Sequence, residues 1–325
     1  MRKKAAFTLA EIAQKAGVSI STVSRCLNNQ GDISPETRRK ILALARATPV
    51  AAEATDVIAV ILPGSGESMG WYMFSLFRGL RKIAEERGKN IEFIPASNLR
   101  YLKEHNFSAI ISMDYFSHLE TILGPMSTIP VICLNNQANP VEQVYSICSD
   151  ESFVVEQSVT YLFDFNHRSI ALLLGFDDHS RTAQLREEAF FRAMTKFQLS
   201  AKSCILRYVS DMDGVVDTLL KKEITAVIAP SESASMKLLQ TIRLAGCKIP
   251  QDLSLIVGEI PHVSEYQEPP LSTVEHDFEK IALCAFDSIE KRLRGEKIPI
   301  LQEMPYLLHK RKSVGVTPLR SPDLG

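Results

Sequence analysis

The chain has 325 residues, 45% of them hydrophobic and 23% charged, and its formal net charge is −1. These values are typical of a globular protein of two or three domains whose core needs no disulfide or metal. No apolar run approaches the roughly 18 residues that span a membrane, and the basic N-terminus lacks the apolar segment of a signal peptide. We therefore expect a cytoplasmic protein.

The charge is unevenly distributed along the chain. Residues 1–48 contain nine Lys or Arg and three Asp or Glu, a balance of +6, which leaves −7 for the remainder. A basic segment on an acidic body favours a polyanion as the partner of that segment, although an ordinary solvated surface has the same charges. The six cysteines are scattered without C-x-x-C spacing, so we expect buried free thiols and no metal or cofactor.

The basic segment predicts three short helices. Thr8 and Glu11 have the spacing of a capping box that opens the first helix, and Gly17 follows where that helix must end in a sharp turn. Ser19 is a good N-cap for a second helix over residues 20–27. Ser34 and Pro35 open a third helix in the same way.

Two helices joined by a tight turn, the second beginning with small polar residues, are typical of a DNA-reading unit. Small side chains let the helix approach base edges in the major groove, and Arg25 is long enough to reach guanine O6 and N7 or a phosphate. A three-helix packing unit without a ligand has the same helical pattern. The sequence therefore leaves both interpretations open at this point.

The segments Ala16-Gly17-Val18-Ser19, Thr22-Val23-Ser24-Arg25, Leu27-Asn28 and Ile33-Ser34-Pro35-Glu36-Thr37-Arg38 closely resemble the headpiece of the lactose/galactose-repressor (LacI/GalR) family. The resemblance implies that base edges are read by Ile20, Ser21 and Arg25. It implies phosphate contacts that set the register, made mostly by Thr22, Ser24 and Asn28. With the two helix-opening residues Thr8 and Ser19, these form the predicted DNA-binding set.

The linker after the third helix departs from that family. The family has a Gly-Tyr-x-Pro-Asn stretch and then a hinge helix whose Leu wedges into the minor groove. Residues 46–56 are shorter by a turn or two of helix, and the Gly-Tyr, the Asn and the Leu are missing. An Ala is a poor wedge for opening a base step, so the usual hinge is degenerate or absent.

From residue 57 onward, strand and helix patterns alternate, which predicts parallel sheets covered on both faces. The number of units predicts two similar lobes. By resemblance they form an α/β, type I periplasmic-binding-protein-like domain with a ligand cleft at the carboxyl ends of the strands. We expect strands at 57–62, 91–94, 109–113, 130–134, 169–174, 204–209, 226–229 and 253–257, and helices at 72–88, 151–163, 182–197, 215–222 and 233–245.

The predicted organisation has three parts. A headpiece occupies residues 1–48, a shortened linker residues 49–56, and an effector-binding and dimerisation domain residues 57–325. Within that domain, lobe 1 is expected over about 57–161 and 277–306, and lobe 2 over about 162–276 and 307–325.

The resemblance also implies an effector pocket. Aromatic faces can stack on a ring, carboxylates can accept from hydroxyls, and an arginine can bind paired oxygens. Four of the candidates have a structural alternative: core or interface packing for Trp71, a helix N-cap for Asp150, a solvated face for Arg186, and a helix-dipole partner for Glu232. The candidates are Trp71, Tyr72, Asp150, Arg186 and Glu232.

The pocket region also departs from the family. The usual Gly-x-Asp-Asp is replaced by Gly258-Glu259-Ile260-Pro261, and the usual Asp-x-x-Asn-Pro by residues 64–70. Gly64, Gly66 and Gly70 do not fit a dinucleotide fingerprint, and no catalytic constellation appears, so we do not expect an enzyme.

The sequence as a whole predicts a homodimeric, sequence-specific DNA-binding regulator, a repressor of a near-palindromic operator. We expect a small effector, a sugar first and a purine or nucleoside second. One alternative is a DNA-binding regulator without an effector, controlled by a protein partner or by abundance. A remote alternative is a solute-binding protein or sugar enzyme.

Overall fold

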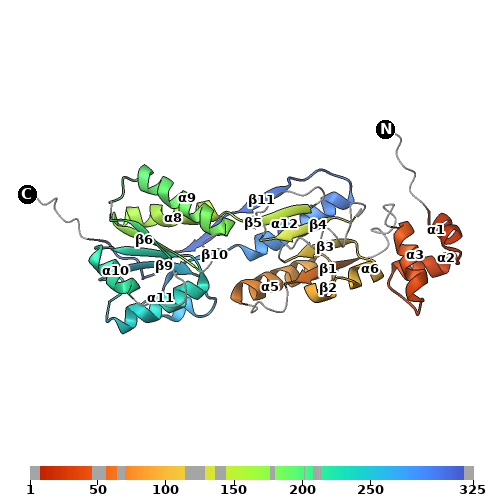
Figure 1. Ribbon diagram of the computed structural model, residues 1–325, viewed down its shortest axis with the longest axis horizontal. Coiled ribbons are helices and arrows are strands. Elements are labelled where there is room, and N and C mark those ends of the chain that lie inside the picture. Colours follow the sequence, from red (N-terminus) through yellow and green to blue (C-terminus); the bar gives the residue numbers. More distant parts are fainter. Residues whose placement is uncertain are drawn as a thin grey trace, which may run out of the picture. The chain divides into compact units, whose positions relative to one another are not determined.

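The computed structural model describes residues 8–45, 56–63, 70–113, 129–135, 144–175, 180–200, 202–207, 212 and 214–317. The chain forms two compact units (Figure 1). Unit 1 comprises Met1–Cys148 and Phe278–Glu303, and unit 2 comprises Ser149–Asp277 and Met304–Gly325. Unit 1 consists of a headpiece of three helices followed by a sheet domain, which we call lobe 1.

The headpiece has the three helices that the sequence predicted. They are α1 (Leu9–Ala16), α2 (Ile20–Leu27) and α3 (Pro35–Ala45). One apolar stripe of each helix enters a shared core, as periodicities of three and four residues require. This core consists of Ile12, Ala13, Ala16, Val23, Cys26, Leu27, Ile41, Leu42 and Ala45.

Lobe 1 has a six-stranded sheet with the order β11-β5-β4-β3-β1-β2. Strands β1 to β5 pair in parallel. Strands β1, β3, β4 and β5 are largely buried, as expected of a sheet covered on both faces, whereas the edge strand β2 is only partly buried. The strands are β1 (Val57–Leu62), β2 (Asn90–Pro95), β3 (Ala109–Ser112), β4 (Val131–Leu134), β5 (Val144–Ser149) and β11 (Leu301–Met304).

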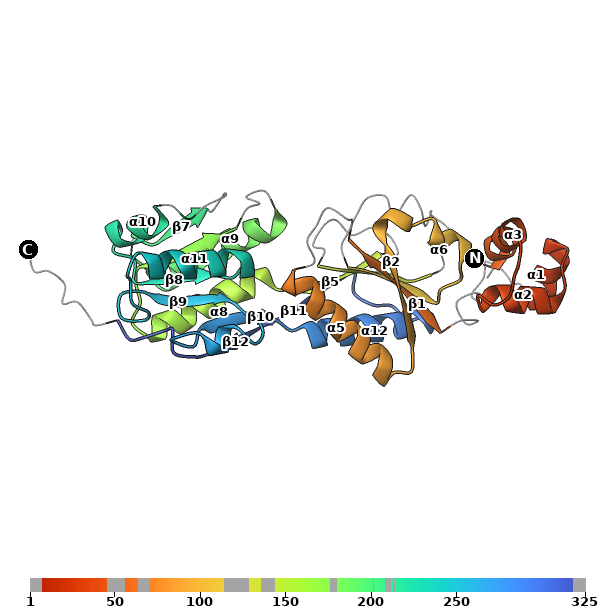
Figure 2. The same ribbon diagram turned by 90° about the horizontal axis from the view of Figure 1, so that it is seen from below.

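Helices α5 (Trp71–Glu86) and α12 (Phe278–Leu293) of lobe 1 lie side by side (Figures 1 and 2). Gly79 permits this approach, because a Cβ there would come within 2.9 Å of the Phe278 carbonyl oxygen. A 3-10 turn (Ala96–Asn98) and the short helix α6 (Tyr101–Glu104) lead into β3.

Unit 2 has a second six-stranded sheet, with the order β12-β10-β9-β8-β6-β7. Strand β12 is antiparallel to β10, whereas the other described pairs are parallel. The strands are β6 (Ile170–Leu174), β7 (Cys204–Arg207), β8 (Ala226–Ala229), β9 (Ser254–Gly258), β10 (Ser272–His276) and β12 (Tyr306–His309).

Helices cover both faces of this sheet. Helices α8 (Glu151–Asp164) and α9 (Arg181–Lys196) lie on one face, and α10 (Val215–Lys221) and α11 (Glu232–Leu244) on the other (Figure 1). Each pair of helices packs against the sheet and forms a separate apolar core with it. A short 3-10 turn (Ser264–Tyr266) precedes β10.

The boundary between the units differs from the expected one. The sequence placed residues 149–161 in the first lobe, and 277 and 304–306 with them, whereas the structure assigns these residues to unit 2. The physical reason is that α8 packs against α9 and contributes Val154, Val155, Val159 and Leu162 to the core of unit 2. None of the described helices is both long enough and apolar enough to cross a membrane.

Candidate nucleic-acid interface

The first helix of the headpiece, α1, is capped at both ends. The Thr8 amide donates to Glu11 Oε2 at 2.7 Å, and the Glu11 amide donates to Thr8 Oγ1 at 3.3 Å, which completes the predicted capping box. The hydrogen bond from the Thr8 backbone lowers the pKa of Glu11. Helix α1 ends at Gly17, whose φ of 74° lies in the left-handed region that glycine adopts without strain.

Helix α2 begins with a set of linked hydroxyl groups. Ser19 Oγ accepts from the Thr22 amide at 3.1 Å and lies 2.8 Å from both Ser21 Oγ and Thr22 Oγ1. At the other end of the helix, Asn28 Nδ2 donates to the Ser24 carbonyl oxygen at 2.9 Å. The small polar residues therefore fix both ends of α2 before any ligand is bound.

The two faces of α2 have opposite character. Val23, Cys26 and Leu27 are fully buried, whereas Ile20 is 53% exposed. Ser21 and Arg25 are also exposed, and Thr22 and Ser24 are half-buried. The residues predicted to read bases thus lie on the solvent side of a helix that is anchored along its other side.

Arg25 lies over the turn that follows α2. A Cβ at Gly31 would overlap the Arg25 guanidinium, so the glycine, with a φ of 77°, leaves space for this side chain. A guanidinium that lies on an exposed turn can extend toward guanine O6 and N7 at little cost in free energy. Asn28 and Thr8 are exposed at the end of α2 and the start of α1.

Helix α3 adds positive charge to the headpiece, in residues for which the sequence alone predicted no site. Arg39 and Lys40 are exposed and Arg38 is half-buried. Arg39 Nε donates to the Pro35 carbonyl oxygen at 3.2 Å, and Arg38 Nη2 to the Gly31 carbonyl oxygen at 3.4 Å. The run of three consecutive basic residues is the feature of the sequence that could have indicated a phosphate-facing surface.

The aromatic effector candidates lie at the start of α5 in unit 1. Trp71 is exposed and makes an edge contact with Phe74 at a ring distance of 6.2 Å. Tyr72 packs edge-on against Phe278 of α12 at 5.2 Å. Tyr72 thus has a packing role within unit 1. The preceding loop, residues 64–69, lies outside the described residues.

Asp150 is the N-cap of α8. Its Oδ1 accepts from the Ser152 amide at 3.1 Å and the Phe153 amide at 2.9 Å. This is the structural alternative for that residue, and it orients the first turn of α8. The cap directs the next residue, Glu151, into the interior of unit 2, where it is buried.

Arg186 is buried, contrary to the solvated face that was its alternative. Its Nε donates to Glu151 Oε2 at 2.7 Å and its Nη2 to the Tyr306 hydroxyl at 3.2 Å. Burial lowers the pKa of Arg186, but the Glu151 carboxylate and the Tyr306 hydroxyl more than offset this effect and raise it overall. The guanidinium is therefore a permanent buried cation.

His276 and Ser149 extend this buried cluster. The Tyr306 hydroxyl donates to Glu151 Oε1 at 3.0 Å and lies 3.2 Å from His276 Nε2, and His276 Nδ1 lies 2.6 Å from Ser149 Oγ. Burial first, and then the Arg186 charge, lower the pKa of His276 to about 3. The sequence did not reveal these partners, because up to 155 residues separate them.

The carboxylate of Glu259 has an internal role, and Glu232 lies at the start of a helix. Glu259, which follows β9, is buried, accepts from Arg311 Nη1 at 2.8 Å and contacts the Thr273 hydroxyl. Glu259, which occupies the x position of the family's Gly-x-Asp-Asp, is thus held by an arginine of the same unit. Glu232 is the first residue of α11, and a Cβ at Gly258 would lie 2.9 Å from its backbone nitrogen.

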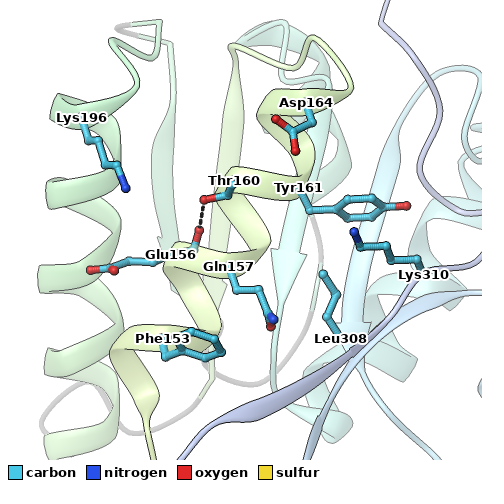
Figure 3. A pocket seen from close by; sticks show the side chains of 9 residues that line it. All are labelled: Phe153, Glu156, Gln157, Thr160, Tyr161, Asp164, Lys196, Leu308 and Lys310. Carbon is cyan, nitrogen blue, oxygen red and sulfur yellow. Dashed lines mark hydrogen bonds between the residues drawn. The ribbon is translucent and has the colours of Figure 1, made fainter.

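The surface of unit 2 has a groove of about 410 Å³ along α8. Figure 3 shows Glu156, Thr160 and Asp164 on the helix, with Lys196 on one side and Lys310 on the other. Thr160 Oγ1 donates to the Glu156 carbonyl oxygen at 2.7 Å. The five effector candidates do not line this groove, so it is separate from the predicted pocket.

Comparison with known proteins agrees with this division of the chain. Residues 8–48 match the family model of bacterial regulatory proteins of the lacI family, and residues 159–314 match a periplasmic binding protein-like domain. The HTH-type transcriptional regulator DegA of Bacillus subtilis is 25% identical over 319 residues, covering 89% of this chain and 92% of DegA.

Solved structures show the same fold. The lac repressor dimer bound to operator and the anti-inducer ONPF superposes with a TM-score of 0.66 at 21% identity, covering 96% of this chain and 100% of that one. The transcriptional regulator CelR in complex with cellobiose has a TM-score of 0.65 at 21% identity, covering 94% and 99%. This chain thus has a DNA-binding headpiece of the lacI family and a periplasmic-binding-protein-like body, and it is similar over most of its length to transcriptional regulators with that headpiece.

Proposed function

We propose that the protein is a sequence-specific repressor that binds a near-palindromic operator in the cytoplasm as a homodimer. The observation that carries this proposal is the arrangement of α2. Its N-terminal half exposes Ile20 and Ser21, and Arg25 follows one turn later on the solvent side. The opposite side of α2 is fully buried in the headpiece core.

Each part of α2 has a chemical role in this proposal. The helix enters the major groove, where Arg25 donates to guanine O6 and N7 and the Ile20 side chain contacts a thymine methyl group. The Ser21 hydroxyl can donate to or accept from a base edge. Thr22, Ser24 and Asn28 bind phosphates, as do the exposed cations of α3, and so set the register.

A second copy of the chain is the proposed dimer partner. Each unit exposes large apolar side chains that a partner would cover. Trp71 and Phe74 are exposed on α5, and Met236 and Leu244 on α11, where Leu244 is 82% exposed. The lac repressor, which has the same fold, is a dimer on its operator. Two headpieces would then read two half-sites.

We also propose a small-molecule effector, with a sugar or sugar derivative as the first class and a purine or nucleoside as the second. CelR, which has the same fold, is known in complex with cellobiose. Among the described residues, Glu151 accepts from Nε of Arg186 and Tyr306 accepts from Nη2. Nη1 is then left to donate to a ligand oxygen. Binding would change operator affinity by roughly 1–3 kcal/mol, as is typical of allosteric coupling.

A regulator without an effector is the second candidate, and two observations favour it. Glu151 and Tyr306 already accept from two of the three nitrogens of Arg186, and Arg311 already holds Glu259. A site whose charged groups are paired internally offers a ligand less binding energy than one with open groups.

The full-length protein tests DNA recognition directly. We would select it against a random pool of duplexes at fixed salt, and we expect an enriched near-palindrome. Arg25→Ala should weaken binding to that site about 10- to 100-fold, because it removes a bidentate base contact. Arg294→Ala, an exposed arginine outside the headpiece, is the matched control. Wild-type affinity in Arg25→Ala would refute the role of α2.

Thermal stabilisation separates the two candidates for regulation. We would measure the Tm of the wild type and of Arg186→Lys with panels of sugars and nucleosides. A compound that raises the Tm of the wild type but not of the variant, and changes operator affinity, identifies the effector class. The regulator without an effector is supported if the Tm stays constant across both panels.

A further inference from the structure

A reciprocal pair of asparagines joins the headpiece to lobe 1. Asn29 Nδ2 donates to the Asn106 carbonyl oxygen at 2.9 Å, and the Asn106 amide donates to Asn29 Oδ1 at 2.9 Å. Asn106 Nδ2 also donates to the Leu27 carbonyl oxygen at 2.8 Å. Three hydrogen bonds thus connect two segments that lie more than 70 residues apart in the chain.

The contact is buried and specific. Asn106 is fully buried, which is uncommon for an asparagine and costly unless its polar groups find partners. The backbone N–H and C=O of Asn106 and its side-chain Nδ2 all bond to the headpiece. Helix α3 of the headpiece also contacts α6 of lobe 1.

Both halves of the pair are held by their own surroundings. Asn29 has a φ of 54°, a left-handed conformation that asparagine tolerates, and its amide donates to the Cys26 carbonyl oxygen at 3.1 Å. On the lobe side, Phe107 next to Asn106 is part of the core, and the Ser108 amide donates to the Val57 carbonyl oxygen at 2.9 Å. The asparagines therefore join one rigid turn to another.

The contact involves the C-terminal end of the reading helix only. Leu27 is the last residue of α2, and Asn29 lies in the turn beyond it. Ile20, Ser21 and Arg25 stay exposed in this arrangement. The pairing thus fixes the direction of α2 relative to lobe 1 and leaves its reading surface free.

We propose that Asn106 is a positioning residue for DNA recognition, which holds the headpiece on lobe 1 through Asn29 and Leu27. This arrangement compensates for the shortened linker of residues 46–56, whose sequence lacks the family's wedging Leu. The two headpieces of a dimer are then presented at a set separation by their lobes. The inference rests on the proposed operator binding.

The test uses the operator selected by the wild-type protein and a series of duplexes in which the two half-sites are moved apart or together. Asn106→Ala removes the Nδ2 group that donates to the Leu27 carbonyl oxygen. Asn29→Gly removes both hydrogen bonds to the Asn106 backbone, and glycine adopts the positive φ without strain. The exposed Asn98, near the same surface of lobe 1, gives the matched control Asn98→Ala.

We expect Asn106→Ala and Asn29→Gly to bind the preferred spacing about tenfold more weakly, as the loss of buried hydrogen bonds implies. They should also lose most of the discrimination between half-site spacings, because headpieces that are not bonded to lobe 1 can adapt to any distance between the half-sites. Each variant keeps the hydrogen bonds that the other removes, because Asn106→Ala retains the two backbone bonds to Asn29 and Asn29→Gly retains the bond from Asn106 Nδ2 to Leu27. The double variant should therefore lose the spacing preference more completely than either single variant. Asn98→Ala should behave as the wild type.

A purely structural role would lower the Tm of Asn106→Ala without changing the preference for spacing, and that outcome overturns the inference. So does unchanged spacing preference in Asn29→Gly, which alters no residue of lobe 1. If the wild type selects no site at all, the proposed operator binding has failed. If it selects a site and both variants match Asn98→Ala, only the positioning role has failed.

Discussion

At the residue scale, Arg186 shows how a side chain with a predicted binding role can have a structural one as well. The resemblance to the family placed Arg186 of α9 in the effector pocket. In the structure its partners are Glu151, at the start of α8, and Tyr306, at the start of β12. A buried charge held by a carboxylate and a hydroxyl contributes to stability mainly because removing either partner leaves it unsatisfied.

We therefore expect Glu151→Gln to lower the free energy of unfolding by about 3 kcal/mol or more, because it leaves the Arg186 cation without its carboxylate. Urea unfolding followed by circular dichroism measures the change. The matched control is Glu156→Gln, which removes an acid on the same helix that pairs with Arg192 on α9 but is half-exposed. That variant should lose less than about 1 kcal/mol. Equal losses in the two variants would contradict the buried-pair interpretation.

At the element scale, capping and periodicity account for most of the helices and strands that the sequence predicted. Ser19 caps α2 by accepting from the amide three residues on, as its position indicated, and Ser180 caps α9 in the same way. Strands β5, β10, β11 and β12 were missed, whereas the edge strands β2 and β7 were predicted. Strand β11 has the sequence LQEM with alternating exposure, and it lacks the buried apolar run that marked the central strands.

Two serines of α2 separate stability from recognition. Ser19→Ala removes the N-cap and should lower the stability of the headpiece by about 1 kcal/mol. Ser21→Ala removes an exposed hydroxyl that is not the cap, so it should leave stability within about 0.5 kcal/mol and weaken operator binding instead. Hydrogen exchange of the α2 amides and operator affinity measure the two effects. A stability loss in Ser21→Ala equal to that of Ser19→Ala would refute the distinction.

At the scale of the whole molecule, unit 2 is held together by contacts between distant segments. His167 Nε2 donates to the Gly315 carbonyl oxygen at 3.0 Å, while Nδ1 accepts from the hydroxyl of Thr225 or Thr317 at 2.8 or 2.6 Å. Burial lowers the pKa of His167 to about 4, against the smaller raising effect of the Gly315 bond. The neutral imidazole is thus part of the folded structure.

We expect this histidine to make stability depend on pH. Its pKa is about 4 when folded and about 6.5 when unfolded, so between these values the unfolded chain binds more protons. The stabilisation is full above pH 6.5 and is lost as the pH falls toward 4, by up to about 3 kcal/mol. Urea unfolding from pH 7 to pH 4 should show a shallower dependence in His167→Gln than in the wild type. The exposed His262→Asn should keep the wild-type slope, and a wild-type slope in His167→Gln would contradict the expectation.

The amino-acid sequence was enough to predict the three capped helices of the headpiece, the two lobes of parallel sheet and the solvent-facing reading residues. Caps, turns and apolar periodicity act within about four residues, so they can be read without knowing the fold. Only the tertiary structure showed that α8 belongs to unit 2, that Glu151 and Tyr306 hold Arg186, and that Asn29 pairs with Asn106. These partners meet through contacts between segments far apart in the chain, and no local pattern of residues encodes a contact of that kind.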